Sequence, residues 1–452
     1  MRTILCVLVA SSLHADDWPQ WLGPQRDSVW RETGIVDTFP AGGPKKLWSQ
    51  PTALGYAGPA VAQGRVVITD RVQARGAKQQ KDLFNKAEID GSERVFCLDA
   101  ATGDPLWVHK YACVYQISYA AGPRCTPVID DGRVFTLGAM GDLVCLSLQD
   151  GSVLWSKNFV KDFGAKVPVW GFACHPMIDG DKLICVGGGK DQLILALDKK
   201  TGATLWASQT VEGDVGYGPP VILDFGGRRQ LIAWHAQAVI SLDPETGTRI
   251  WSVPFASKAA LTVPTPRKVG DDRLFLTSFY HGGLMLKVGK DAAQIVWKSK
   301  AKGERPSATL DLSSIMATPF VDGEMIYGVD SYGELRGLTL DGHRKWMTMK
   351  ATRGSLTPEA IAAKDEPADG ERWSNAFLVK NGERYFLFNE QGDLIIAKLS
   401  PKGYEEVSRA HLIDPLNTLA RTRKVVWMHP AFADRKVFVR NDEEIAAYDL
   451  AK

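Results

Sequence analysis

The chain has 452 residues, among them 54 basic and 52 acidic side chains, 43 glycines and 14 tryptophans. The near-balanced charge gives no support for nucleic acid or an anionic membrane as the main partner. No later stretch of the sequence approaches the ~18 consecutive apolar residues of a membrane-spanning helix, so no transmembrane segment is expected. Frequent glycine turns and many large aromatic anchors favour an all-β protein.

The first 15 residues have the pattern of a secretory signal peptide. Arg2 precedes the apolar run Ile4–Ala10, and small residues lead to a cleavage position after Ala15. The alternative is an ordinary buried N-terminal strand. Because Cys6 lies too early to be a lipid-modified cysteine, we expect an exported protein of the periplasm or extracellular space, and not a lipoprotein.

Six cysteines follow the predicted signal peptide, and none of them forms a C-x-x-C pair. The spacings of zinc sites, thioredoxin-type motifs and haem attachment are therefore absent. An exported compartment permits disulfides, and the sequence leaves their pattern open. Most of these cysteines are expected to be small buried core residues.

One ten-residue pattern recurs along the chain. It appears as LDAATGDPLW (98–107), LSLQDGSVLW (146–155), LDKKTGATLW (197–206) and LDPETGTRIW (242–251), with worn copies that end at Trp297 and Trp346. The tryptophans recur every 45 to 51 residues. A fixed period of this length indicates a repeat architecture.

Each repeat contains four short β-strands. In the clearest copy, residues 126–155, β-branched and aromatic runs alternate with turns at Asp131-Gly132, Gly141-Asp142 and Asp150-Gly151. Four antiparallel strands cannot bury both of their faces alone, whereas units arranged radially can. The pattern therefore predicts a β-propeller with one blade per repeat.

The repeated decamer is predicted to fasten one blade to the next. The Asp-x-x-Thr-Gly turn joins the third and fourth strands, and the following indole is placed to pack between neighbouring blades. Removal of one such buried ring should cost about 3–5 kcal/mol. The predicted docking tryptophans are Trp48, Trp107, Trp155, Trp206, Trp251, Trp297 and Trp346.

The last repeat, residues 429–452, ends before a fourth strand, while PKKLWSQP (44–51) has the pattern of a fourth strand carrying its own tryptophan. We therefore predict an eight-bladed propeller over residues 44–452, closed by this N-terminal strand so that no sheet edge is free. Residues 16–43 form an N-terminal extension. In the seventh copy, LSPKGYEEV, Val407 takes the tryptophan position. Seven blades with an unrelated cap remain the alternative.

The decamers resemble the tryptophan-docking repeats of pyrroloquinoline-quinone dehydrogenases and their propeller relatives, which include the non-enzymatic outer-membrane assembly lipoprotein. The segment DWPQWLGPQRDSVWRETGI (17–35) resembles the opening of exported quinone-binding-like propellers. In that family the quinone lies beside an adjacent cysteine pair, with acidic and amide ligands for Ca²⁺. This chain has no adjacent cysteines and is short for the enzymes, so pyrroloquinoline quinone (PQQ) is not expected to bind.

Polar side chains gather on the predicted top face of the ring. The turns between second and third strands carry Asp70, Asp330, Asn389, Glu390, Asn441 and Asp442, and the linkers carry Arg372, Trp373, His175 and His429. Oxygen ligands with aromatics in a concave mouth suit a sugar or Ca²⁺. The alternative is structural, because tight turns prefer Asp and Asn and a histidine at a strand start is often satisfied by backbone.

Two long insertions, 71–93 and 348–371, interrupt the repeats and are candidate lids or contact loops. The second contains a predicted short helix that begins near Thr357.

These observations favour a monomeric, non-enzymatic propeller that binds a protein partner or a polysaccharide at its top face, without a required cofactor. The alternative is a quinone-dependent oxidoreductase of alcohols or sugars. The sequence leaves the question of enzymatic activity open.

Overall fold

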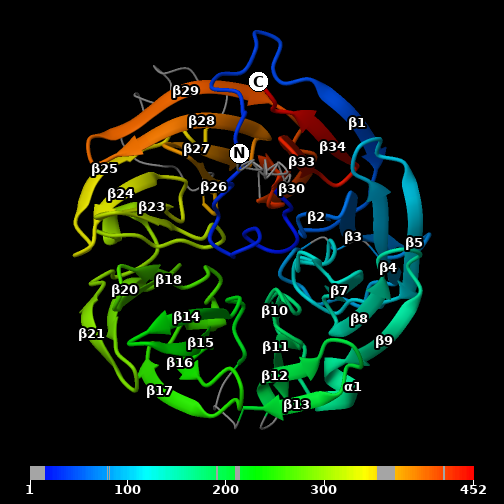
Figure 1. The fold of residues 1–452 in the computed structure, drawn as a ribbon, viewed down its shortest axis with the longest axis horizontal. Helices are drawn as coiled ribbons and strands as arrows, with labels where there is room; N and C mark the ends of the chain where they lie inside the picture. The colour runs from blue at the N-terminus through cyan, green and yellow to red at the C-terminus, as the bar shows by residue number, and fades with distance from the viewer. Residues whose placement is uncertain are drawn as a thin grey trace, which may run out of the picture.

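A computed structural model describes residues 16–78, 80, 82–189, 192–208, 214–353, 372–420 and 423–452. In these residues eight four-stranded antiparallel sheets form a closed ring around a central channel (Figure 1). The eight-bladed propeller predicted from the repeats is therefore confirmed, and the seven-bladed alternative is excluded. The predicted signal peptide and the predicted helix near Thr357 lie outside the described residues.

The first four blades follow the repeat order, each built from innermost to outermost strand. Blade 1 contains β2 (Ala60–Ala62), β3 (Arg65–Gln73), β4 (Gly91–Asp99) and β5 (Pro105–Ala112). Blade 2 contains β6 (Val128–Asp130), β7 (Arg133–Leu137), β8 (Asp142–Ser147) and β9 (Val153–Asn158). Blade 3 contains β10 (Met177–Asp179), β11 (Lys182–Gly189), β12 (Gln192–Asp198) and β13 (Thr204–Ala207). Blade 4 contains β14 (Val221–Phe225), β15 (Arg228–Trp234), β16 (Ala238–Leu242) and β17 (Arg249–Pro254).

The other half of the ring repeats this arrangement. Blade 5 contains β18 (Arg267–Val269), β19 (Arg273–Ser278), β20 (Gly282–Val288) and β21 (Ala293–Lys298). Blade 6 contains β22 (Phe320–Asp322), β23 (Met325–Val329), β24 (Leu335–Thr339) and β25 (Arg344–Thr348). Blade 7 contains β26 (Ala376–Asn381), β27 (Arg384–Asn389), β28 (Asp393–Ser400) and β29 (Gly403–His411). Blade 8 contains β32 (Ala431–Ala433), β33 (Lys436–Arg440), β34 (Glu444–Asp449) and β1 (Lys46–Pro51).

Short elements occupy some of the linkers between blades. They are the helix α1 (Phe159–Phe163), the 3₁₀ turns η1 (Lys258–Ala260) and η2 (Pro306–Ala308), and the hairpin β30 (Asn417–Ala420) with β31 (Arg423–Val425).

The ring is closed by the strand predicted for this role. The strand β1 pairs antiparallel with β34, with Trp48 opposite Ala447 and Gln50 opposite Ile445. The first and the last strand of the described chain therefore share one sheet, which closes the ring between blades 8 and 1.

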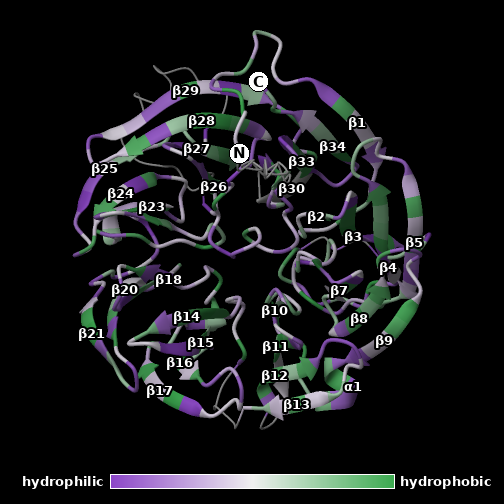
Figure 2. Ribbon diagram, viewed as in Figure 1, coloured by the Kyte–Doolittle hydropathy of each residue, from purple (hydrophilic) through white to green (hydrophobic). Residues whose placement is uncertain are grey.

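Within each blade the strands differ in burial. The outermost strand β5 alternates exposed and half-buried residues, whereas β23 is buried throughout. Figure 2 shows the corresponding mixture of polar and apolar residues along the rim of the ring. The hydrophobic core is divided into clusters that lie between neighbouring sheets, as one expects when each blade must bury both of its faces.

Six of the seven predicted docking tryptophans donate the indole N–H to a backbone carbonyl of the next blade. The Trp107 indole N–H donates to the Leu148 carbonyl of blade 2 at 2.9 Å. The ring lies on the next turn so closely that a Cβ on Gly151 would come within 2.5 Å of it, and Gly151 has a φ of 71°. The glycine is therefore required by both backbone conformation and close approach. Equivalent hydrogen bonds join Trp48 to Ala100, Trp155 to Lys199, Trp206 to Pro244, Trp297 to Leu340 and Trp346 to Ser400.

Trp251 docks through an intermediary side chain. The next turn has Ala293 where the other turns have glycine, so a Cβ occupies the space that the indole would need. The Trp251 N–H instead donates to Oε1 of buried Gln230 at 2.7 Å. The Gln230 amide N–H then reaches the carbonyls of Gly289 and Lys290 in blade 5, at 2.8 and 3.2 Å. One glutamine thus transmits the contact between blades 4 and 5.

Blade 7 departs from the prediction by one residue. Its strand register places Ser408 opposite Ile396 and leaves Val407 at the bulge, so Ser408 and not Val407 takes the tryptophan position. The Ser408 hydroxyl accepts a hydrogen bond from the Phe39 backbone N–H at 2.9 Å. Phe39 is buried with the core of blades 7 and 8, so the N-terminal extension supplies an aromatic ring where this blade has no indole.

Candidate ligand-binding site

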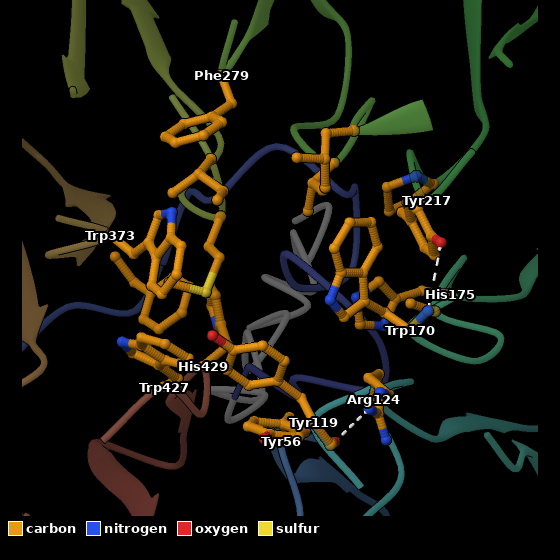
Figure 3. A pocket seen from close by; sticks show the side chains of 18 of the residues that line it. Tyr56, Tyr119, Arg124, Trp170, His175, Tyr217, Phe279, Trp373, Trp427 and His429 are labelled. Atoms are coloured by element: carbon orange, nitrogen blue, oxygen red, sulfur yellow. Dashed lines mark hydrogen bonds between the residues drawn. The ribbon is translucent and has the colours of Figure 1, made fainter. Parts of the chain in front are cut away.

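A pocket of about 290 Å³ lies at the centre of the ring. Its walls come from the linkers that join each blade to the next, together with turns on the same face (Figure 3). This is the face to which the sequence assigned the candidate site. The pocket is lined by Trp21, Tyr56, Gly58, Phe84, Tyr119, Arg124, Thr126, Trp170, Ala173, His175, Tyr217, Pro219, Leu261, Val263, Phe279, Tyr280, Ile315, Met316, Arg372, Trp373, Phe377, Trp427 and His429.

One position of the repeat contributes a wall residue from every blade. The residue four places before each first strand lines the pocket, in the order Tyr56, Arg124, Ala173, Tyr217, Val263, Met316, Arg372 and Trp427. Alternate residues of an extended chain point the same way, about 6–7 Å apart. The position two places before the strand therefore forms a deeper ring, of which Gly58, Thr126, His175, Pro219 and His429 line the pocket.

The N-terminal extension forms the floor of the pocket. The Trp21 ring stacks on His175, with centroids 4.1 Å apart and planes 7° from parallel, and it lies 4.8 Å from the His429 ring. Its indole N–H donates to the Thr265 hydroxyl in blade 5 at 3.1 Å. A single aromatic side chain thus connects linkers from three blades at the base of the channel.

The rest of the extension fastens Trp21 in place as it crosses the middle of the ring (Figure 1). Trp18 forms a bridge with Val61 of blade 1. The buried guanidinium of Arg26 donates to the carbonyls of Pro176 and Pro220, which open blades 3 and 4. In the other half, the Lys380 N–H of blade 7 donates to the Ser28 carbonyl. The extension therefore closes the channel from below and leaves the pocket open on the top face.

The two floor histidines are neutral near pH 7. Burial, reinforced by the charge of Arg26, lowers the pKa of His175 well below its ordinary value, and burial lowers the pKa of His429 to about 4. The Thr126 backbone N–H donates to Nδ1 of His175 at 2.8 Å, whereas Nδ1 of His429 lies 2.6 Å from the Pro430 carbonyl. Nδ1 of His429 must therefore carry the proton, and the two rings adopt opposite tautomers.

Aromatic side chains form the wall beside blades 7, 8 and 1. The Tyr119 ring lies 6.3 Å from Trp373 and 6.5 Å from Trp427. Tyr119 and Trp373 both have positive φ, 54° and 69°, an uncommon conformation for bulky residues that surrounding contacts must hold. Such conformations occur preferentially at functional sites.

The first insertion adds the rim of this aromatic wall. The Phe84 ring lies 5.3 Å from Tyr119 and 6.1 Å from Trp373. Its loop is held by the Tyr119 N–H, which donates to the Leu83 carbonyl at 2.7 Å, and by the Ser118 hydroxyl, which donates to the Phe84 carbonyl at 2.9 Å. The expected overhang on the top face is present for this part of the insertion, while residues 79 and 81 lie outside the described chain.

Two arginines bring positive charge to the pocket. The Arg372 guanidinium pairs with Glu304 and lies 4.9 Å from the Trp373 ring. Arg124 instead donates to backbone carbonyls, those of Gly122, Ser118 and Tyr119, and lies 5.0 Å from the Tyr56 ring. The pocket therefore combines aromatic walls with a small number of cationic groups, an arrangement typical of ligand sites.

Of the ten candidate site residues, the structure brings Arg372, Trp373, His175 and His429 together at the pocket. The other six side chains make hydrogen bonds within the blades or to the linkers beside them. Asp70 accepts two hydrogen bonds from Arg94 and one from the Ala53 N–H. Asn389 and Asn441 accept bonds from the backbone of their own turns. These are the contacts of the structural alternative.

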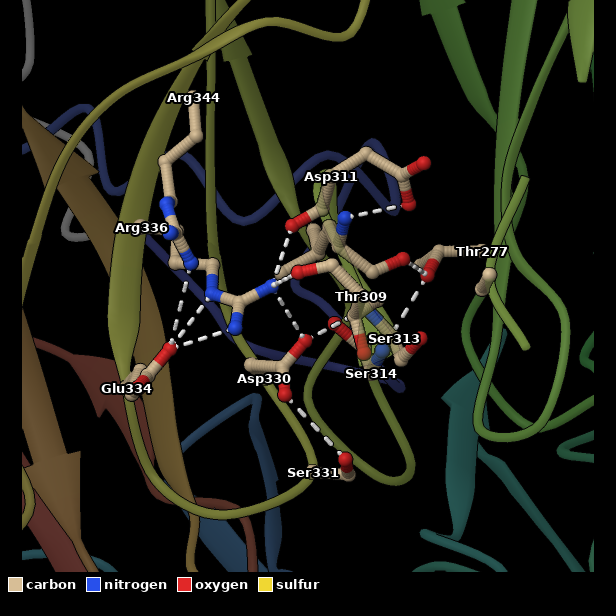
Figure 4. Close-up of polar contacts among 12 residues, drawn as sticks. Thr277, Thr309, Asp311, Ser313, Ser314, Asp330, Ser331, Glu334, Arg336 and Arg344 are labelled. Carbon is tan, nitrogen blue, oxygen red and sulfur yellow. Dashed lines mark hydrogen bonds and ion pairs between the residues drawn. The ribbon is translucent and has the colours of Figure 1, made fainter. Parts of the chain in front are cut away.

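Asp330 belongs to a buried network in blade 6 (Figure 4). It lies 3.0 Å from the guanidinium of Arg336 and accepts the Ser313 N–H at 2.8 Å. Burial outweighs the attraction of Arg336 and raises the pKa of Asp330 to about 6. Arg336 also donates to Glu334 and to the Asp311 carbonyl. Asp330, at the end of β23, therefore connects β24 with the linker that precedes blade 6.

The remaining acids of the proposed arc are also engaged. Glu390 accepts hydrogen bonds from Arg423 at 2.7 Å and from the Trp427 indole at 3.2 Å, so it supports a pocket wall from behind. Asp442 accepts the Gly55 N–H at 3.1 Å. Within the described residues, no group of three His, Cys, Asp or Glu side chains is placed to hold a metal ion.

Most pocket residues were not identified from the sequence. Tyr56, Tyr119, Trp170, Tyr217 and Phe279 line the pocket, yet none belongs to a motif with known chemistry. A signal was present, because an aromatic residue precedes the proline that opens a blade in GYAGP (55–59), GYGPP (216–220) and WMHP (427–430). Trp21 had no such signal, since nothing in the repeats indicates where the extension runs.

Comparison with known proteins identifies the repeats. A family model described as outer membrane protein assembly factor BamB matches residues 91–263 and 235–452. Among curated proteins, the quinoprotein ethanol dehydrogenase of Pseudomonas aeruginosa is 24% identical over 227 residues, 45% of this chain and 34% of that protein. The assembly factor BamB of Salmonella typhimurium is 28% identical over 144 residues, 29% of this chain and 31% of that protein. The matches thus span about a third of these relatives.

Solved structures share the fold at low identity. BamB from Moraxella catarrhalis superposes with a TM-score of 0.53 at 16% identity, covering 90% of this chain and 97% of that one. Quinohemoprotein alcohol dehydrogenase from Comamonas testosteroni gives a TM-score of 0.58 at 12% identity, covering 96% and 80%. At such identities the likeness concerns the fold alone. In the described part of this chain, no helix has the length and apolar character to cross a bilayer.

Proposed function

Since this chain belongs to the repeat family described as outer membrane protein assembly factor BamB, whose fold serves both assembly factors and quinone enzymes, we propose a function from the pocket. We propose that the protein is an exported, monomeric binding propeller that holds a saccharide segment in its central pocket and does not turn it over. The observation that carries the proposal is the pocket itself, which is closed from below by Trp21 and walled by Tyr119, Trp373 and Trp427.

Saccharide rings suit this arrangement for two reasons. The faces of a sugar ring carry C–H groups that pack on aromatic rings, while its edges carry hydroxyls that need polar partners. Fixed aromatic side chains bury area with little loss of conformational entropy on binding. A pocket of about 290 Å³ is close to the small end of ordinary ligand sites, so it would take one or two rings of a longer chain that enters from the top face.

The alternative enzyme is a quinone-dependent oxidoreductase, which the dehydrogenase relatives make worth testing. The aromatic walls and Arg124 would suit a planar, carboxylated quinone such as PQQ. Little in the described residues supports its Ca²⁺ ion, because no group of three His, Cys, Asp or Glu side chains there is placed for a metal. Two carboxylates that contact pocket-wall side chains, Glu304 and Glu390, are already paired with arginines.

A pair of methionines in blade 6 provides the test. Met316 lines the pocket, whereas Met347 is 47% exposed on the outer strand β25. Calorimetric titration against a saccharide panel should give binding that Met316→Ala weakens roughly tenfold, since burial of such a side chain contributes about 1.5–3 kcal/mol. Met347→Ala should bind like the unmodified protein.

The same titrations decide between the candidates. Binding of PQQ with Ca²⁺, together with dye-linked oxidation of an alcohol or sugar, would overturn the non-enzymatic assignment. If no saccharide binds, the saccharide proposal is wrong, and a protein partner, as the name of the assembly-factor relatives suggests, becomes the leading alternative.

A further inference from the structure

Arg124 carries a charge that no carboxylate of the described chain neutralises. Its Nη2 donates to the carbonyls of Ser118 and Tyr119, at 3.1 and 2.5 Å, and its Nη1 donates to that of Gly122. Among the residues that the structure describes, no Asp or Glu forms an ion pair with it, whereas Arg372 on the facing wall is paired with Glu304. Neutral carbonyls fix the guanidinium in place and leave its net charge facing the pocket.

Two hydroxyl groups beside Arg124 are buried without hydrogen-bond partners among the described residues. They are the Thr126 Oγ1 and the Tyr56 hydroxyl, and both residues line the pocket. Thr126 is only 3% exposed and lies two residues after Arg124 on the same linker, while the Tyr56 ring lies against the guanidinium. Buried polar groups without partners are rare in proteins, so this sector has hydrogen-bonding capacity that the described residues leave unused.

The opposite sector of the pocket is mostly apolar, and the guanidinium beside it, that of Arg372, is paired with Glu304. This sector is formed by Leu261, Val263, Phe279, Ile315 and Met316 from blades 5 and 6. The floor adds no competing charge, because His175 and His429 are neutral. A ligand would therefore meet a cation and two hydroxyls on one side and hydrocarbon on the other, which specifies both its chemistry and its orientation.

We propose, building on the saccharide-binding function above, that the pocket recognises an acidic sugar, and that Arg124, Thr126 and Tyr56 bind its carboxylate and an adjacent hydroxyl. The ring of the sugar lies across Trp373 and Trp427, with its less polar edge toward Met316. A hydrogen bond to an ionised group is stronger than a neutral one, and in a pocket with little water the charge of Arg124 acts with little screening. The carboxylate is therefore the part of the ligand that determines specificity.

The first experiment uses the unmodified protein. Oligogalacturonate is titrated against its methyl ester, which keeps every ring and removes only the charge. We expect the free acid to bind roughly 10- to 100-fold more tightly, the range expected for one hydrogen bond to a charged group. Equal affinities of the acid and the ester would overturn the inference and leave the saccharide function standing. If neither compound binds and neutral saccharides also fail, the proposed function itself fails.

Variants then locate the effect. Arg124→Gln should remove most of the preference for the acid over the ester, Arg124→Lys should retain part of it, and Thr126→Val should lower the affinity for both compounds. Arg249→Gln, on an exposed position of β17, is the matched control and should change neither affinity. Loss of preference in the control variant, or an unchanged preference in Arg124→Gln, would contradict the assignment.

Because Arg124 also fastens the Gly122 and Ser118 carbonyls, its substitution could disturb the linker. The ratio of acid to ester affinity, measured within each variant, is insensitive to a uniform loss of binding and keeps the test decisive. PQQ, an aromatic tricarboxylate, is the last compound to be titrated. If it bound more tightly than every uronate and lost affinity in Arg124→Gln, the saccharide assignment would be overturned in favour of an aromatic acid.

Discussion

Two positions of the repeat contribute one side chain per blade, one to the interface between blades and the other to the pocket wall, and they differ in how often the same residue type recurs. At the docking position, seven blades have tryptophan, because the indole meets a turn of the next blade, directly in six blades and through Gln230 in blade 4. At the channel position, the eight residues are Tyr, Arg, Ala, Tyr, Val, Met, Arg and Trp.

The difference follows from what each position contacts. A docking residue contacts another copy of the repeat, so the neighbour's geometry restricts it in every blade. A channel residue contacts the open pocket, so its identity is set by the ligand and by the residues across the channel. A residue type that recurs at one position in most blades therefore indicates a role in stability. A position at which the residue type varies from blade to blade indicates the binding site. This distinction can be tested because variants at the first position should affect unfolding and variants at the second should affect binding.

The largest expected effect comes from opening the ring. Replacement of Lys46–Pro51 by a Gly-Ser segment of equal length removes β1 and the Trp48 contact while it keeps the tether to the extension. The loss of one buried indole alone costs about 3–5 kcal/mol, and the pairing of β1 with β34 is lost as well. We expect the melting temperature to fall by at least about 5 °C. A variant that melts within a degree or two of the unmodified protein would show that the ring does not depend on this strand.

The interface between blades 4 and 5 offers a sharper comparison. Gln230→Ala removes the intermediary between Trp251 and blade 5 and leaves the indole N–H and two carbonyls unpaired. It should lower the free energy of unfolding by about 2–4 kcal/mol, nearly as much as Trp155→Ala at an ordinary interface. Gln237→Ala is the control in the same blade, since Gln237 is exposed.

Denaturant unfolding of the three variants measures these differences. The control should change stability by no more than about 0.5 kcal/mol. If Gln230→Ala lowered the free energy of unfolding by no more than the control does, the glutamine would not contribute to stability. Apolar packing alone would then hold the interface between blades 4 and 5.

Much of the fold could be predicted from the sequence because the same pattern of strands and turns recurs in each repeat. The spacing of six tryptophans gave the repeat, and two further copies without tryptophan, together with the strand-like segment around Trp48, gave eight blades and the closure. The exceptions needed coordinates. Ser408 replaces Val407 at the docking position because a bulge shifts the register by one residue, and Gln230 lies 21 residues before the tryptophan that it serves.

The site could be predicted only in part. The top face and four pocket residues, among them Arg372 and His175, followed from the position of the linkers. Asp70 and Asp330 could not be distinguished in advance, because a turn and a binding site select the same side chains. The floor was beyond sequence reasoning, since Trp21 reaches the channel through an extension that is outside the repeat.

The smallest expected effect is the contribution of His429, in the floor of the pocket, to the pH dependence of the unfolding free energy. Burial lowers the pKa of His429 to about 4, whereas the unfolded chain should have the ordinary value near 6.5. Between these values the unfolded state binds the proton and the folded state does not, so this histidine's contribution is present above pH 6.5 and is lost as the pH falls toward 4. Between pH 7 and 5 the loss amounts to about 2 kcal/mol.

Asp330 acts in the opposite direction over part of the same range, because its raised pKa of about 6 makes the folded state bind the extra proton and lose stability as the pH rises. The net profile of the unmodified protein is therefore partly cancelled, and only a comparison isolates the histidine. In His429→Gln, the drop in unfolding free energy between pH 7 and pH 5 should be about 2 kcal/mol smaller than in the unmodified protein, as measured by urea unfolding at both values. Parallel profiles would mean that His429 takes up its proton equally in the folded and the unfolded chain, so that burial does not lower its pKa.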